Sequence, residues 1–459
     1  MARKPFAKTI RPAGKAAWLR VVAGIALIWL ALFAVIVASS GISVGERVMA
    51  YVDIMRGKTS SAVKIGLVYA DGDEVNSFTN GARLAAARVN AEGGILGQDL
   101  ELLLYREEVS FGEGGFERTV ARTMRLAGEV ARQNGLFGVI GHEWSDTAIT
   151  ASAIYNQNDI LYLATHATAS SLTNHGFSLL FALQPDNSDN TEMIARYALA
   201  TGLKRFLVLT DKSDYGKEAG DFFSAVATQQ GGNVVFRGYL PGHGRSVDQL
   251  LMFILDNNLF GKGDYDAFFV ASALTLDTAE FIRRARELGL DKPVLGLEYM
   301  FSNTIENHVG RQKMKDVIGV SLFDSESVNA LSTGFVSSYL QQYNGMPDLS
   351  AALGYDAVML LKEVTERTGT RDPGRIADAL KVARYGVPFE GVTGKIVFNT
   401  KGLITDTDVF VVRHDGTRFQ TVASYRKPLE WSPDTIIERS GDDSALMPDP
   451  AANKEHTVP

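Results

Sequence analysis

The chain has 459 residues, of which 46% are hydrophobic and 22% are charged. This composition is typical of a globular protein, and the length predicts two packed units rather than one core. The formal net charge is −7, and removing the six basic residues of segment 1–20 leaves 40 basic against 53 acidic residues, a net charge of −13. An acidic body argues against nucleic acid as a partner, because that binding requires phosphate neutralisation. The chain has no cysteine, which excludes disulfides, thiolate metal sites, cysteine nucleophiles and lipid-modified cysteine anchors.

The N-terminus combines a basic segment, 1–20, with an apolar stretch. Val21–Ala38 contains no polar side chain, and its eighteen residues suffice to span about 30 Å of hydrocarbon. We therefore predict a single-pass inner-membrane protein with an anchor at 21–41 and a juxtamembrane linker at 42–61. The basic residues precede the span, so the N-terminus is expected in the cytoplasm and the body outside it. A signal peptide cleaved near Ala38 is the alternative, although its apolar core is usually shorter, roughly 7–15 residues.

From Ala62 onward, predicted strands and helices alternate. Most strands are short, continuous apolar runs, as expected where helices cover both faces of a parallel sheet. The pattern predicts an α/β fold with doubly wound sheets, which bind ligands beyond the carboxyl ends of their strands. Helices are predicted between the strands, for example at Phe116–Gln133 and Thr278–Leu288. The predicted strands are Val63–Tyr69, Leu100–Arg106, Leu136–His142, Ile160–Thr165, Leu179–Leu183, Arg205–Asp211, Asn233–Tyr239, Ala267–Ala273, Pro293–Glu298 and Val317–Phe323.

The C-terminal part differs in character. Three predicted helices are followed by short segments in which apolar and polar residues alternate, separated by turn signals. This pattern predicts a small antiparallel sheet near the C-terminus. Residues 426–459 hold five of the thirteen prolines and no long periodic pattern. This tail is predicted to be largely disordered, with Trp431, Ile436 and Ile437 as its candidates for packing on the body. The helices are predicted at Val328–Tyr343, Ala351–Thr368 and Pro373–Val382, and the strands at Lys395–Asn399, Val409–His414 and Phe419–Tyr425.

Signatures of catalysis are weak. The spacing of His142, His166 and His175 fits no metal template, and the HEWSD run at 142–146 lacks the second histidine of HExxH. The sequence contains no Walker motif, no GxSxG elbow and no GxGxxG fingerprint. No cofactor, metal or enzymatic activity is therefore predicted.

Several short motifs occur in an order that resembles a known family. They are Ile65-Gly66, Gly81-Ala82, Val89-Asn90, Gly93-Gly94-Ile95, Gly97, Val139-Ile140-Gly141-His142, Ala167-Thr168, Leu172-Thr173, Asp211-Lys212, Tyr215-Gly216, Arg283–Leu290, Gly296-Leu297-Glu298 and Tyr355-Asp356-Ala357. Their order, over roughly residues 62–425, resembles type I periplasmic binding proteins. Within that family they resemble the leucine/isoleucine/valine-binding receptors of ABC transporters.

The resemblance implies a two-lobe type I periplasmic-binding fold with three hinge crossovers. Lobe I would comprise 62–184 plus 325–388, and lobe II 185–324 plus 389–425. The protein would capture an amino acid or similar small polar solute in the cleft between the lobes, which would close by a hinge motion, and deliver it to an ABC-type permease. A ligand-sensing receptor that signals to a separate membrane partner is the alternative. A periplasmic enzyme is a weaker third hypothesis.

An amino-acid site needs donors for the ligand carboxylate and an acid for its ammonium. By resemblance, Ser145 and Thr147 at a helix start, together with Ala167 and Thr168, supply the donors. Also by resemblance, Glu298 takes the ammonium. Each residue has a structural alternative: an N-cap for Ser145, a hydroxyl bonded to its own backbone for Thr168, and an exposed strand-end acid for Glu298.

Other candidates depart from the family pattern. Tyr215 resembles a cleft-facing position, with plain packing as its alternative. Trp144 is bulky at a position where relatives have smaller residues. Asn187 lies near the position of an acidic residue in the family. Thr275 lies where relatives often carry an aromatic residue. The acidic loop 71–74 lies where relatives usually have a Gly/Ser-rich segment. Its acids could favour a cationic ligand, but we prefer the interpretation that they form a solvated loop. A preference for branched-chain ligands therefore does not carry over.

Overall fold

The computed structural model describes residues 62–70, 76–110, 114–241, 246–256, 265–325, 329–427 and 436–437. The predicted basic segment, anchor and linker lie outside the described residues, as do the acidic loop 71–74 and Trp431. Within the described ranges, no helix is both long enough and apolar enough to cross a bilayer.

The first half of the chain forms a five-stranded parallel sheet in the order β2-β1-β3-β4-β5. Its strands β3 and β4 are buried over almost their whole length, because helices cover both faces. The strands are β1 (Val63–Ala70), β2 (Leu100–Glu107), β3 (Leu136–Gly141), β4 (Leu161–Ala164) and β5 (Leu180–Ala182). The helices are α3 (Ser77–Ala91), α4 (Gly115–Ala131), α5 (Ser145–Gln157) and α6 (Ser171–Asn174), joined later in the chain by α12 (Ala330–Tyr343), α13 (Leu349–Thr368), α14 (Pro373–Val382) and η3 (Ala383–Tyr385).

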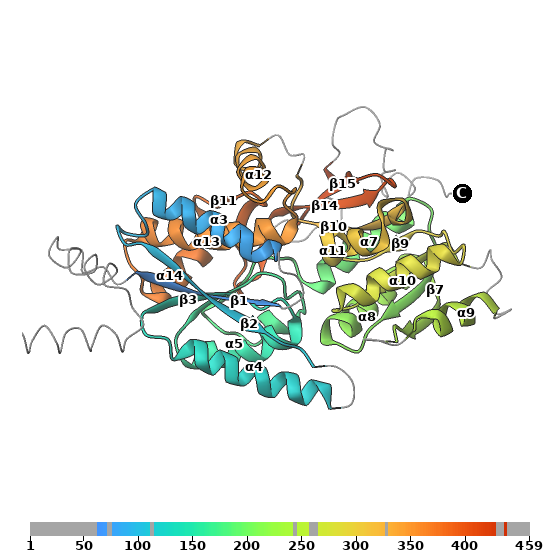
Figure 1. Ribbon diagram of the computed structural model, residues 1–459, viewed down its shortest axis with the longest axis horizontal. Helices are drawn as coiled ribbons and strands as arrows, with labels where there is room; N and C mark the ends of the chain where they lie inside the picture. Colours follow the sequence, from blue (N-terminus) through green and yellow to red (C-terminus); the bar gives the residue numbers. More distant parts are fainter. Residues whose placement is uncertain are drawn as a thin grey trace, which may run out of the picture. The chain divides into compact units, whose positions relative to one another are not determined.

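Helices α3 and α13, which are far apart in the sequence, lie side by side (Figure 1). Two glycines permit this contact. A Cβ on Gly81 would lie 1.9 Å from the carbonyl oxygen of Ala351, and a Cβ on Gly354 would lie 2.3 Å from that of Phe78. The backbones therefore approach closely at these two positions, and the C-terminal helix closes the core over the N-terminal one.

The second sheet has eight strands in the order β16-β15-β14-β10-β9-β8-β6-β7. Strands β6 to β10 are parallel, whereas β14, β15 and β16 join the sheet antiparallel. The strands are β6 (Arg205–Thr210), β7 (Asn233–Tyr239), β8 (Ala267–Ala271), β9 (Val294–Leu295), β10 (Val317–Ser321), β14 (Thr407–His414), β15 (Phe419–Lys427) and β16 (Ile436–Ile437). The helices are α7 (Asn187–Ala200), α8 (Asp214–Gln229), α9 (Asp248–Asp256), α10 (Thr275–Glu287), η1 (Glu298–Phe301), α11 (Asn303–Val309) and η2 (Arg311–Met314). The predicted α/β architecture with parallel sheets is confirmed.

A small third sheet stands between these parts of the chain. It consists of β11 (Phe389–Gly391), β12 (Gly394–Phe398) and β13 (Ile404–Thr405). The buried carboxylate of Asp356 in α13 accepts hydrogen bonds from the backbone N–H groups of Val392 and Thr393, at 2.7 and 2.9 Å. The backbone N–H of Ala182 in β5 donates to the carbonyl of Gly402. Since β12 also contacts β14, the sheet adjoins both larger ones, and the predicted lobe boundary at residue 389 stays a prediction.

Two predicted segments differ in the structure. The run PVLGLE was expected as a strand ending at Glu298, but β9 covers only Val294–Leu295 and Glu298 begins the 3-10 turn η1. Gly296 permits this turn, because the Met300 side chain lies where a Cβ at residue 296 would be. At the C-terminus, β15 extends to Lys427, and Ile436–Ile437 pair with β15 as β16. The remainder of the predicted disordered tail lies outside the described residues.

Candidate functional site

The candidate residues follow the carboxyl ends of strands in both large sheets. In the five-stranded sheet, Trp144 and Ser145 follow β3 and Thr168 follows β4. In the eight-stranded sheet, Tyr215 follows β6 and Glu298 follows β9. This is the edge at which parallel sheets usually bind ligands.

Hydrogen bonds connect the predicted residues across more than a hundred positions of sequence. Thr168 Oγ1 lies 2.8 Å from Asn187 Oδ1 and 3.2 Å from Glu298 Oε1. The backbone N–H of Asn187 donates to the Thr168 carbonyl at 2.7 Å. Ser145 Oγ accepts from the backbone N–H of Ala169 at 3.2 Å. The structure thus brings Ser145, Thr168, Asn187 and Glu298 into one buried polar cluster.

Glu298 is buried, with 6% of its surface exposed. Removal from water raises the pKa of its carboxyl to about 7, because burial penalises the charged form more than the Thr168 hydroxyl stabilises it. Its Oε1 contacts Thr168, whereas the buried Oε2 has no hydrogen-bond partner among the described residues. A buried oxygen left without a donor is costly, so this atom marks a position that is ready for a ligand donor.

The Thr168 hydroxyl lies between two acceptors. Asn187 Nδ2 donates to Glu218 Oε2 at 3.2 Å, which turns the amide oxygen of Asn187 toward Thr168. The Thr168 hydroxyl carries a single proton, so it donates to either Asn187 Oδ1 or Glu298 Oε1 at any one time. Among the described residues, Glu298 therefore shares its one side-chain donor, which agrees with its raised pKa.

Several contacts join the loops of the two large sheets around this cluster. Trp144 Nε1 donates to the carbonyl of Ala273 at 3.1 Å, and the Tyr299 hydroxyl donates to the carbonyl of Glu143 at 2.5 Å. Tyr215 is buried, and its ring packs edge-on against that of Tyr299 with 5.4 Å between the centroids. Trp144 and Tyr215 therefore lie in the wall around the cluster.

Other candidates lie farther from a ligand role. The Thr147 hydroxyl donates to the carbonyl of Trp144, within its own helix turn. The Ala167 side chain is buried among apolar neighbours. Thr275 is the first residue of α10 rather than part of a loop, and it is half-buried. Among the residues that the structure describes, none of these three side chains donates a hydrogen bond to the Thr168–Glu298 cluster, so their ligand roles stay predictions.

Sequence reasoning missed two acids that the structure brings to the cluster. Glu218 accepts from the backbone N–H of Ser170 through both carboxylate oxygens, at 3.1 and 3.0 Å, in addition to its bond from Asn187. The Glu143 carboxylate accepts from the backbone N–H of Ala70 at 2.8 Å, and burial raises its pKa to about 7. A usable signal existed for Glu218, because residues three apart on a helix share a face and Tyr215 was already a candidate.

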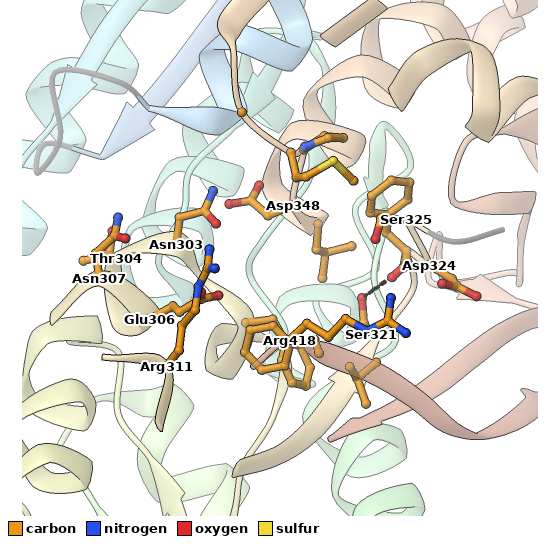
Figure 2. Close-up of a pocket in the computed structure, with 18 of the residues that line it drawn as sticks. Asn303, Thr304, Glu306, Asn307, Arg311, Ser321, Asp324, Ser325, Asp348 and Arg418 are labelled. Carbon is orange, nitrogen blue, oxygen red and sulfur yellow. Dashed lines mark hydrogen bonds and ion pairs between the residues drawn. The ribbon is translucent and has the colours of Figure 1, made fainter. Parts of the chain in front are cut away.

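Two hollows lie near the cluster, and only the smaller one is lined by Glu298. A small one of about 20 Å³, beside Glu298 and Tyr299, has room for one water-sized molecule. A larger one of about 1270 Å³ shares Phe301, Asp348 and Leu349 with it. Figure 2 shows side chains of α11 on one side of the larger hollow and the labelled residues of 321–325 on the opposite side. An amino acid does not fit beside Glu298 in this arrangement, so its entry requires the walls to separate.

Comparison with known proteins identifies the family. A family model described as periplasmic binding protein matches residues 62–418. The chain belongs to the periplasmic binding protein family. Its resemblance to the leucine/isoleucine/valine-binding subgroup is also confirmed. The family and its structural neighbours are solute-binding proteins, not enzymes.

The named relatives are distant in sequence, but the matches extend over most of both chains. A leucine-, isoleucine-, valine-, threonine- and alanine-binding protein of Pseudomonas aeruginosa is 24% identical over 343 residues, which cover 74% of this chain and 85% of that protein. A Leu/Ile/Val-binding protein of Rhizobium johnstonii is 25% identical over 365 residues, which cover 78% and 90%.

Solved structures share the fold. A substrate-binding protein of Desulfitobacterium hafniense in complex with leucine is 25% identical, with a TM-score of 0.64, and the match covers 79% of this chain and all of that one. A binding protein of Rhodopseudomonas palustris in complex with benzoate is 18% identical, with a TM-score of 0.68, and the match covers 79% and 96%. The two-lobe fold of this family is therefore established for the chain.

Proposed function

We propose that this binding protein captures an amino acid or similar small polar solute between its lobes and delivers it to an ABC-type permease. The observation that carries this proposal is Glu298, a buried carboxyl group whose Oε2 has no donor among the described residues. An ammonium group would supply that donor in a charge-assisted hydrogen bond. The names of the Pseudomonas and Rhizobium relatives, both amino-acid-binding proteins, support the same ligand class.

The other pole of the ligand would meet the start of α5. Trp144 is the N-cap residue of this helix and provides no side-chain cap. The first backbone N–H groups of a helix have no acceptor within it, and they favour an anion. We propose that these groups, with the hydroxyls of Ser145 and Thr168, hold the carboxylate of the ligand. Thr147, Ala167, Tyr215, Asn187 and Thr275 complete the proposed site.

The proposed lobes keep the boundaries expected from the sequence: 62–184 plus 325–388, and 185–324 plus 389–425. An anchor at 21–41 would tether them to the outer face of the inner membrane, with the N-terminus in the cytoplasm. A tethered receptor that signals to another membrane protein is the second candidate, favoured by the anchor, because transport does not require the binding protein to stay attached.

Thermal unfolding of the full-length protein with single amino acids tests the binding function. A ligand present at a hundredfold excess over its Kd adds about 2.7 kcal/mol to the free energy of unfolding. We expect such a rise with at least one amino acid, and a much smaller one for Glu298→Gln. The absence of any rise across amino acids and related amines would contradict the proposal.

Deletion in the source organism separates the two roles. Loss of uptake of the bound solute supports delivery to a permease. Persistent uptake with a lost transcriptional or motility response supports the sensor.

A further inference from the structure

Several segments that contribute to the proposed site also bring an acid. Glu143 precedes Trp144, Asp146 lies between Ser145 and Thr147, and Asp214 precedes Tyr215. Glu218 is bonded to Asn187, and Glu298 is part of the cluster itself. The backbone N–H of Asp214 donates to Asp146 Oδ1 at 3.2 Å, so these two acids from opposite sides of the cleft face one another. The walls of the site are therefore rich in carboxylates.

The acids of these walls are bonded to neutral donors. Glu298 contacts the Thr168 hydroxyl, Glu218 accepts from the Ser170 backbone and the Asn187 amide, and Glu143 accepts from the Ala70 backbone and the Asn76 amide. Within the described ranges, none of these three carboxylates has a lysine, arginine or histidine among its hydrogen-bond partners. Acids elsewhere do: Glu287, for example, is bonded by two arginines and a lysine. These three carboxyls thus have only neutral hydrogen-bond partners in the described ranges, and burial raises the pKa of each.

Nearby basic groups do not bond these three carboxyls. Lys212 and Lys217 are exposed. Burial lowers the pKa of His166 to about 3, so this histidine is neutral. Arg311 in the larger hollow donates to Glu306 at 2.6 Å rather than to an acid of the site. A cationic ligand would therefore have no basic partner of Glu143, Glu218 or Glu298 to displace among the described residues.

The Glu298 Oε2 atom, which has no hydrogen-bond partner among the described residues, is a second observation that points to a ligand. It is a buried oxygen on the edge of the small hollow. In the described part of the chain, no three His, Asp or Glu side chains come together in a way that could hold a metal ion. The geometry therefore favours an organic cation, which approaches carboxylates one ammonium or guanidinium group at a time.

We propose that the solute of this cleft carries net positive charge, as a basic amino acid or a diamine does, with one cationic group on Glu298 and a second on Glu218. This inference rests on the proposed function and narrows it to a ligand class. A neutral amino acid brings one cationic group, which Glu298 would bind. A second ammonium or guanidinium group would meet Glu218, whose partners Ser170 and Asn187 are neutral donors.

Isothermal titration calorimetry on the full-length protein tests the ligand class. The panel contains L-lysine and L-arginine, putrescine, L-leucine and L-threonine, L-glutamate and benzoate. We expect at least one cationic compound to bind about tenfold or more tightly than every neutral or anionic one. Putrescine has no carboxylate, whereas the basic amino acids have one, so a comparison of their affinities shows whether the carboxylate of the ligand is needed. If a neutral or anionic compound binds as tightly, the proposal of a cationic ligand is wrong, while the proposed binding function stands. If no compound binds, the proposed function fails as well.

Variants on one helix locate the second cationic group. Glu218→Gln should weaken binding of the cationic ligand about 10- to 100-fold, and by clearly more than it weakens binding of any neutral compound. Asp221→Asn is the matched control, since Asp221 lies one turn further along α8, is exposed and pairs with Arg237. Equal losses for cationic and neutral ligands in Glu218→Gln would assign Glu218 to the fold instead. If this variant does not fold, the panel on the unmodified protein still decides the ligand class.

Discussion

Burial of the Glu298 carboxyl opposes folding and, in the proposed site, would favour binding. Its pKa of about 7 exceeds the ordinary value of 4.5, because burial penalises the ionised form. Between these two pH values the folded state holds more protons than the unfolded state, so stability falls as pH rises. Above pH 7 the ionised carboxylate costs about 3 kcal/mol. Glu298→Gln should therefore raise the free energy of unfolding at pH 8 by up to about 3 kcal/mol and change it little near pH 4.5.

The same substitution should weaken binding of an ammonium ligand by about 2–5 kcal/mol at pH 8. In the unmodified protein, affinity should fall as pH drops below 7, by up to about tenfold for each pH unit, because the ligand must displace the proton of Glu298. Denaturant unfolding and calorimetry at three pH values measure both effects. A Gln variant that is no more stable than the original at pH 8 would show that Glu298 is adequately solvated.

The part of the site that could be predicted from the sequence is the part that lies at strand ends. Thr168 and Glu298 stand just beyond apolar runs, and both enter the buried cluster. Glu218 and Tyr299 were missed, because their importance comes from contacts with Ser170 and Glu143, respectively, across the cleft. Sequence periodicity describes one element at a time, so contacts between distant elements leave no periodic signal.

Among elements, buried strands were predicted best and turns worst. The run at Leu136–His142 became β3 with a shift of one residue at its end, because four to eight apolar residues in succession have few alternatives to a buried strand. The run PVLGLE failed because Gly296 allowed the chain to fold back over Met300. Hydrophobicity alone does not reveal such a turn, since the same residues remain buried in either arrangement.

The contact between α3 and α13 depends on two positions without side chains. Gly354→Ala would place a methyl group 2.3 Å from the carbonyl oxygen of Phe78, which forces the helices apart. We expect a loss of about 1–3 kcal/mol in the free energy of unfolding, measured in denaturant. Gly334→Ala in α12 is the control, since its Cβ would meet no atom within 4 Å; it should be neutral or stabilising by up to about 1 kcal/mol. Equal behaviour of the two variants would contradict the close approach.

For the molecule as a whole, opening of the cleft requires specific contacts to break. The Tyr299 hydroxyl bond to the Glu143 carbonyl and the Trp144 bond to the Ala273 carbonyl cross from one side to the other. Tyr299→Phe removes the first bond and keeps the ring contact with Tyr215. We expect faster amide hydrogen exchange at residues 143–148 without ligand, because one of the bonds that cross the cleft is lost. Unchanged exchange would mean that this bond does not hold the cleft closed.

Attachment to the membrane would decide how a captured solute reaches its partner. As a helix, eighteen apolar residues rising about 1.5 Å each would span about 27 Å, close to the thickness of the hydrocarbon layer. The core of a cleaved signal is usually shorter, at roughly 7–15 residues. We therefore expect the intact mass of the protein extracted from membranes to include residues 1–40, and the protein to remain in the membrane fraction after washing at high salt and high pH. A soluble form whose N-terminus lies after Ala38 would show cleavage instead, and would favour a freely diffusing carrier over a tethered receptor.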